Sequence, residues 1–227
     1  YAFAYGGRDG DSAGAIIGTT NFALAHEDQD STGWHAWFFQ FAFAATAATI
    51  VSGSVAERTK FSAYFLYSII ITAFIYPVVV HWVWGSGWLS AWGALNGPLF
   101  SHNASVSNGF VDFAGSGVVH MVGGFAGGVG AFVVGPRKGR FEVMPNGMLG
   151  KPLDMPGHSM VICALGVIIL WFGWYGFNAG STLCAMGCMD LASKVAVTTT
   201  IAAAVACLTA AFLSKVLSGK FDLATGL

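Results

Sequence analysis

The stretch VDFAGSGVVHMVGGFAGGVGAFVV, residues 111–134, is long and apolar enough to cross a bilayer as a helix. It also contains Asp112, His120 and seven glycines. An ionisable side chain inside a membrane helix is costly unless water or a partner relieves it, so its presence indicates a functional position. The stretch therefore predicts a membrane helix with a chemical task.

The composition supports the same interpretation. Hydrophobic residues make up 55% of the 227 residues and charged residues 9%, with a mean hydropathy of +0.65, whereas a soluble domain has about 25% charged residues. The net charge of -1 favours neither nucleic acid nor an acidic partner. We therefore predict an integral membrane protein.

Apolar runs predict five spans, at residues 34–55, 61–82, 112–134, 159–181 and 190–214. All five are expected to be helices, because an open strand cannot satisfy its backbone hydrogen bonds in lipid. The fold class is thus an all-α polytopic membrane protein, with residues 1–227 forming one domain. The apolar beginning YAFAY and the ending LATGL predict further spans before and after this chain.

The loops differ in their content of lysine and arginine, which accumulates on the cytoplasmic side of a membrane. One side has eight such residues, namely Arg58, Lys60, Arg137, Lys138, Arg140, Lys151, Lys215 and Lys220, and the other has Arg8 and Lys194. Loops 6–33, 85–109 and 182–189 are therefore predicted to lie outside. The glycosylation sequon at Asn103 agrees with this orientation.

The face of the third span that carries His120 is predicted to be small and polar. At 100° per residue it groups Ser116, Gly117, Gly123, Gly124, Gly127 and Ala131 with His120, opposite Val118, Val122, Phe125, Val129 and Phe132. Since small residues mark helix contacts in membranes, we expect His120 to face the bundle and the bulky residues to face lipid or a neighbouring subunit. His120 then serves a pore or proton pathway, or is a structural histidine. For Asp112 a functional carboxylate and a helix-capping carboxylate remain alternatives.

Aromatic residues gather near the outer ends of three other spans. They are Trp37, Phe39 and Phe43 in the first span, Trp82, Trp84 and Trp88 after the second, and Trp174 and Phe177, with Ser181, in the fourth. Each alone is typical of an interfacial belt. Together with an acid and a hydroxyl they indicate a vestibule for a cation.

Metal, cofactor and enzyme chemistry find little support. Cys163, Cys184, Cys188 and Cys207 lie in or beside apolar segments, where cysteine packs as a small hydrophobe. No histidine or second cysteine pair completes a metal site, and the glycines at 115–130 lie within a span rather than in a phosphate-binding loop. We expect neither a metal nor another cofactor, and no enzymatic activity.

Four segments, FQFAF, VAERTKFSAY, DFAGSGVVHMVGG and GWYGFNAGS, resemble the ammonium transporter family (Amt/Mep/Rh), and more closely its Amt branch. The resemblance extends over essentially the whole chain. It implies a trimer of eleven-helix protomers, each with its own pore, of which this chain corresponds to the third through seventh helices. It also implies ammonium or ammonia as the substrate, with methylammonium as an analogue.

The resemblance also assigns roles. It implies that Phe43 and Phe177 form a stacked gate, that Trp84 and Ser181 form an outer cation site, and that Asp112 lies beneath that site. Phe39 and Trp174 are expected nearby, Trp82 and Trp88 are alternatives to Trp84, and His120 is the first of two pore histidines. The implied protein is a homotrimer or a heterotrimer with related subunits in the plasma membrane. An ammonium sensor with the same fold is the alternative function.

Overall fold

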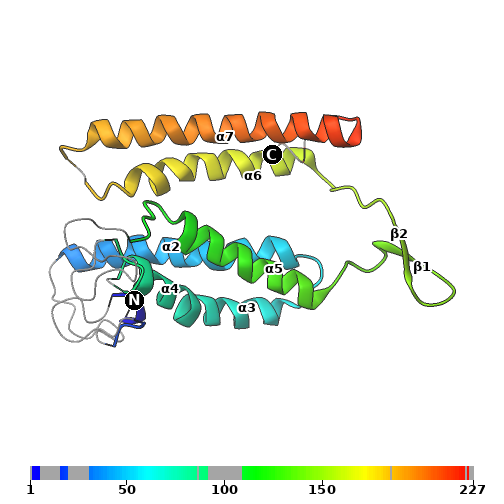
Figure 1. Ribbon diagram of the computed structural model, residues 1–227, viewed down its shortest axis with the longest axis horizontal. Helices are drawn as coiled ribbons and strands as arrows, with labels where there is room; N and C mark the ends of the chain where they lie inside the picture. Colours follow the sequence, from blue (N-terminus) through cyan, green and yellow to red (C-terminus); the bar gives the residue numbers. More distant parts are fainter. Residues whose placement is uncertain are drawn as a thin grey trace. The chain divides into compact units, whose positions relative to one another are not determined.

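The computed structural model describes residues 2–5, 16–19, 31–85, 87–91, 109–184, 186–222 and 224. Its contacts divide the chain into two compact units, unit 1 at residues 1–151 and unit 2 at residues 152–227. Each unit is described by itself, and Figure 1 identifies their elements.

Five helical segments of the described chain are long and apolar enough to span a membrane. Unit 1 contains three of them: α2 (Ser31–Val55); α3 (Phe61–Ile70) continued by η2 (Ile71–Ile75) and α4 (Tyr76–Val83); and η3 (Ser116–Met121) continued by α5 (Val122–Val134). Unit 2 contains α6 (Met160–Trp174) with η4 (Tyr175–Ala179), and α7 (Met189–Ser218). The prediction of a helical, multi-span membrane protein is confirmed.

Three of the spans contain a wider π-helical turn, in the segments η2, η3 and η4. The turn η2 ends two residues before Pro77, the second residue of α4. Proline has no N–H to continue the helical hydrogen bonds and its ring crowds the preceding turn, which accounts for the local widening. A π-helical turn changes which side chains lie on the same face of a helix. The change is most important in η3, because this segment contains His120.

The centre of unit 1 is the contact between α2 and α5, which lie side by side in Figure 1. A Cβ added to Gly123 would lie 2.8 Å from the Ile50 Cβ and 2.9 Å from the Ala47 carbonyl oxygen. A Cβ on Gly127 would lie 2.6 Å from the Ser54 hydroxyl. The two helices therefore approach closely, as small residues allow in membrane proteins, and at Gly123 a side chain would meet the backbone of α2.

The C-terminal ends of α2 and α5 are joined by charged side chains. Arg58 donates to the carbonyl oxygen of Gly135, at 2.6 Å, and to that of Ser54. Glu57 and Arg137 form an ion pair at 2.6 Å. These contacts connect the turn after α2 to the turn after α5.

A β-hairpin follows α5, where the sequence suggested only a loop. Its strands are β1 (Phe141–Val143) and β2 (Leu149–Pro152). Gly147 has a φ of 80°, and Met144 N–H donates to the Met148 carbonyl at 2.9 Å. Gly147 N–H also donates to the Met144 carbonyl at 2.8 Å, so Met144–Gly147 form a tight turn that ends in a left-handed glycine, a common connection in hairpins. Figure 1 shows the hairpin beyond the end of α5.

The four-residue helix α1 (Ala2–Tyr5) packs against α4 in unit 1. The fully buried His81 places its Nδ1 2.8 Å from the Ala4 carbonyl oxygen. Phe3 meets Phe74 edge to face, with ring centroids 5.9 Å apart. The apolar beginning of the chain is thus part of the packing of unit 1.

In unit 2, η4 is held against α7 by side-chain hydrogen bonds. Tyr175 and Thr200 share a hydrogen bond of 2.8 Å between their hydroxyls, and Asn178 Nδ2 donates to the Thr199 hydroxyl at 3.0 Å. These bonds fix the η4 segment, which also carries Phe177, against the long α7.

Candidate functional site

Three predicted aromatic residues come together in unit 1. Phe39 and Phe43 lie one turn apart on α2, with ring centroids 4.7 Å apart. Trp84, directly after α4, meets Phe43 edge to face at 5.7 Å. Phe43 is only 2% exposed, whereas Phe39 and Trp84 are half-buried. The three rings therefore form a continuous aromatic wall with Phe43 at its deepest point.

The structure also separates Trp84 from the two neighbouring tryptophans. The Trp84 indole N–H donates to the backbone carbonyl of Asp112 at 2.7 Å. Trp82 and Trp88 instead pair with each other at 5.6 Å, and the Trp82 indole donates to the Ile16 carbonyl. Of the three, Trp84 is thus the one that links the aromatic wall to the third span.

The carboxylate of Asp112 is turned toward the beginning of the third span. One oxygen accepts from the backbone N–H groups of Gly115 at 2.6 Å and Ser116 at 3.0 Å, and the other from those of Gly117 at 2.9 Å and Val118 at 2.8 Å. The side chain is 1% exposed. This is the capping geometry, in which a carboxylate satisfies N–H groups that lack a partner within the helix.

The glycines around the cap are required by the backbone. Gly115 has a φ of 93°, and a Cβ there would lie 2.6 Å from Val119. A Cβ on Gly117 would lie 2.9 Å from the Phe110 ring and 3.3 Å from the Asp112 carboxylate. The sequence DFAGSG thus lets the chain wrap around the carboxylate closely enough for four hydrogen bonds.

The small residues that were expected to share one face of the third span with His120 lie on two different faces of that helix. Gly123 and Gly127 are buried against α2, whereas His120 is exposed within unit 1, as are Ser116, Gly124 and Gly128. A Cβ added to Gly124 or Gly128 would meet no described atom within 4 Å. The straight-helix projection failed because η3 is a π-helix, which rotates the residues before Val122 relative to those after it.

The same change of winding overturns one predicted lipid-facing residue. Val118 was expected on the outward side but is fully buried in unit 1. Phe125, Val129 and Phe132, all beyond η3, are 70%, 63% and 88% exposed within unit 1, as expected for residues that face lipid or another part of the protein.

Unit 2 carries the remaining candidates, Trp174, Phe177 and Ser181. Ser181 is 9% exposed, and its hydroxyl donates to the Phe177 carbonyl at 2.7 Å. Trp174 lies beside Trp171, with ring centroids 5.9 Å apart. Phe177 and Ser181 therefore belong to one local structure. The pairing of Phe177 with Phe43 would join the two units and stays a prediction.

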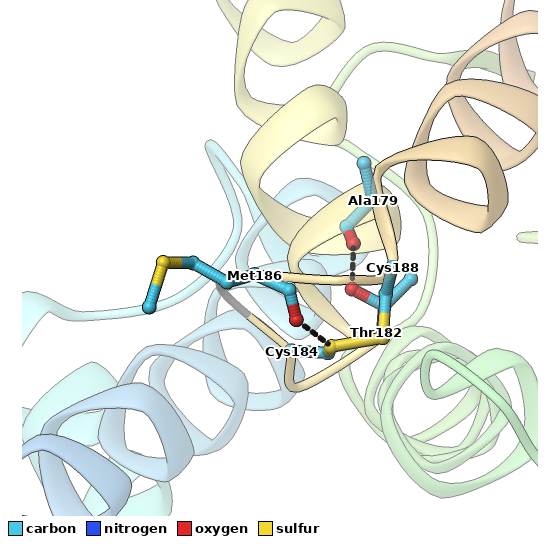
Figure 2. The surroundings of a disulfide bond; sticks show 5 residues. All are labelled: Ala179, Thr182, Cys184, Met186 and Cys188. Atoms are coloured by element: carbon cyan, nitrogen blue, oxygen red, sulfur yellow. Dashed lines mark hydrogen bonds between the residues drawn. A yellow bond between two sulfur atoms is a disulfide. The ribbon is translucent and has the colours of Figure 1, made fainter.

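Cys184 and Cys188, expected to pack as separate apolar side chains, instead form a disulfide with a Cα–Cα distance of 5.8 Å. Figure 2 shows this bond in the segment between η4 and α7, where Thr182 donates to the Ala179 carbonyl at 3.0 Å. The spacing of four resembled a helical repeat, but residues 182–184 and 186–188 are not helical. Their position on a predicted outer loop was the signal that could have revealed the bond, because disulfides persist in oxidising surroundings.

Other residues of the site were not singled out from the sequence. Gly115 shapes the cap, and Tyr175 and Asn178 fix η4 through threonines of α7. Among the described residues no cluster of three histidines, cysteines or acids could hold a metal ion. The sequon at Asn103 lies outside the described residues.

Comparison with known proteins gives consistent results. The model of the Ammonium Transporter Family matches residues 1–226. Ammonium transporter 1 member 3 of Oryza sativa subsp. japonica is 44% identical over 233 residues, covering 98% of this chain. Ammonium transporter Amt2 of Archaeoglobus fulgidus is 45% identical over 207 residues, covering 91% of this chain. Ammonium transporter 1 member 1 of Arabidopsis thaliana is 44% identical over 232 residues, covering 98% of this chain.

The matches cover 45%, 42% and 44% of these three relatives, respectively. The chain thus spans a little under half the length of the proteins that it resembles. All three are named as transporters rather than enzymes.

Proposed function

Because the chain belongs to the ammonium transporter family, we propose that it forms half of a narrow pathway for ammonium or ammonia across a membrane. The observation that carries this proposal is the position of Trp84, whose ring contacts Phe43 and whose indole N–H bonds to Asp112. One residue thereby joins an aromatic cation surface to the beginning of the helix that carries His120.

The energetics favour loss of the proton at the entrance. Removing an ammonium ion completely from water costs tens of kcal/mol, whereas an aromatic ring recovers about 2 kcal/mol or somewhat more. The aromatic wall can therefore select the cation but cannot move it through a dry interior. We propose that the ion is bound beside Trp84 and Ser181 and loses its proton to water of the outer entrance at a gate of Phe43 and Phe177. Neutral ammonia then passes His120, whose two ring nitrogens offer one donor and one acceptor.

For Asp112 the hydrogen bonds favour a positioning role. Both carboxylate oxygens are engaged by backbone N–H groups, and the side chain is buried. Asp112 therefore assists recruitment by fixing the beginning of the third span and the carbonyl that orients Trp84. Its negative charge still favours a cation nearby.

The proposed orientation places loops 6–33, 85–109 and 182–189 outside, and the disulfide at 184–188 supports it, because disulfides persist on the oxidising side of a membrane. We further propose a homotrimer, or a heterotrimer with related subunits, in the plasma membrane. Cross-linking in native membranes tests this assembly, and dimers as the largest product would contradict it.

Uptake of labelled methylammonium into cells or proteoliposomes tests the function. We expect His120→Ala to abolish uptake, and His158→Ala, at an exposed histidine outside the spans, to leave uptake unchanged. Undiminished uptake by correctly inserted His120→Ala protein would contradict the proposed pathway. If the wild-type protein binds methylammonium without moving it or carrying current, the protein is a sensor instead.

A further inference from the structure

We propose that the Cys184–Cys188 disulfide is a positioning device for Ser181, which holds the turn carrying this hydroxyl at the outer entrance. The inference rests on the proposed function, since it concerns the outer site of the same pathway. Its argument starts from the backbone between η4 and the first cysteine.

Three tight turns follow η4. Ser181 N–H donates to the Asn178 carbonyl at 3.2 Å, Thr182 N–H to that of Ala179 at 3.2 Å, and Leu183 N–H to that of Gly180 at 3.0 Å. The Ser181 hydroxyl also donates to the Phe177 carbonyl. The direction of this hydroxyl therefore depends on a short turn structure that ends at Leu183.

Leu183 has a backbone conformation that leucine resists. Its φ is 52°, in the left-handed region where Cβ crowds the following carbonyl. Its side chain is 75% exposed, so burial of the leucine does not compensate for this conformation. A restraint on the neighbouring backbone is needed to keep Leu183 in this conformation. The disulfide supplies it, because its first cysteine is the next residue, Cys184.

The other end of the disulfide lies on a rigid element. Cys188 is the residue that caps the beginning of α7, and its carbonyl accepts from Ala192 N–H at 3.0 Å. The same helix binds η4 through Thr199 and Thr200. The disulfide therefore links the backbone after Leu183 to the beginning of α7. Since α7 is also hydrogen-bonded to η4, the segment between η4 and α7 is held at both of its ends.

Without the disulfide, Leu183 is free to return to a right-handed or extended conformation. The Leu183 N–H bond to Gly180 then weakens, and the turn that orients the Ser181 hydroxyl loses the restraint at its C-terminal end. The proposal thus predicts a local effect on residues 181–183 and a weaker interaction with the substrate, without a loss of assembled protein.

The test combines Cys184→Ser with Cys188→Ser and measures amide hydrogen exchange and methylammonium uptake. We expect faster exchange at residues 181–183 and a KM raised about fivefold, equivalent to about 1 kcal/mol, with an unchanged maximal rate. Adding Leu183→Gly should restore both values, because glycine adopts a positive φ without strain. Cys163→Ser with Cys207→Ser is the matched control, since neither cysteine belongs to a disulfide.

Reduction after assembly avoids any effect on folding. A membrane-impermeant phosphine becomes the phosphine oxide, with oxygen from water, while both sulfurs become thiols. It should reproduce the double variant in the wild-type protein. Unchanged exchange, an unchanged KM, or a lower maximal rate with unchanged KM would each overturn the proposal. A wild-type protein without uptake would refute the proposed function, while the exchange experiment would still decide whether the disulfide holds this turn.

Discussion

The two units fix their candidate residues by different means. In unit 1 the beginning of η3 is held by a carboxylate that is 1% exposed and accepts four backbone hydrogen bonds. In unit 2 the end of η4 is held by a serine hydroxyl, short turns and a disulfide. One unit uses a buried charge and the other a covalent bond.

The two units also differ in burial within this chain. Phe43 and Val118 are buried among three spans in unit 1, whereas no described residue of α6 or α7 is buried. A carboxylate needs a protected environment with several donors to be worth desolvating. The disulfide, in contrast, is a covalent restraint that acts whether or not its surroundings are buried.

The largest expected effect is at Asp112. Asp112→Ala removes the acceptor for four N–H groups, and we expect the free energy of unfolding to fall by about 3 kcal/mol, with loss of methylammonium uptake. Asp112→Asn keeps one acceptor oxygen, so its free energy of unfolding should fall by about half as much. Thermal denaturation in detergent measures both. Equal effects of the two substitutions would show that the cap is not what stabilises unit 1.

Two adjacent glycines test the packing that gives unit 1 its interior. Gly123→Ala places a methyl group within 3 Å of α2, and we expect it to lower the free energy of unfolding by about 2 kcal/mol. Gly124→Ala, where a Cβ meets no described atom within 4 Å, should be neutral. The denaturation midpoints of the Gly123→Ala and Gly124→Ala variants test this expectation. Identical midpoints would argue against a close contact between α2 and α5.

For unit 2 the corresponding experiment is reduction of the disulfide. Closing a ring of five residues stabilises by about 2 kcal/mol in the chain-entropy description. We expect reduction to accelerate amide exchange at the end of η4 and at the beginning of α7. The exchange rates in η3 should stay unchanged. Equal acceleration in both units would remove the distinction between them.

The smallest effect concerns a hydroxyl in unit 2. Tyr175→Phe removes the hydroxyl that accepts from the Trp171 indole and bonds to Thr200, and we expect a loss of about 0.6 kcal/mol, as for single hydrogen bonds between membrane helices. Denaturation of the Tyr175→Phe and Thr200→Val variants, alone and combined, measures the coupling. Fully additive losses would mean that the two hydroxyls do not act together.

Hydropathy was sufficient to predict the spans, because the cost of exposing backbone to lipid leaves only helices. The prediction for the third span began at Asp112, four residues before the helix at Ser116, because an apolar run does not distinguish a capping segment from a helix. The hairpin has a local turn signal at Asn146-Gly147, which hydropathy does not detect.

The relationships between distant residues were harder to predict. The π-helical turn at 116–121 rotated Val118 into the interior, and no periodicity in the sequence marked it. Trp84 was chosen among three tryptophans only through family resemblance, since its contact with Phe43 spans 41 positions of the chain. The disulfide forms because residues 182–184 and 186–188 are not helical. The spacing of four between Cys184 and Cys188 instead suggested a helix, in which the two side chains pack as apolar neighbours.

Arg58 has a mechanical consequence for unit 1. By donating to the carbonyls of Ser54 in α2 and of Gly135, the residue after α5, it joins the C-terminal ends of the two helices. The C-terminal end of α2 therefore cannot shift independently of the turn after α5, and a displacement of that turn moves both helices together.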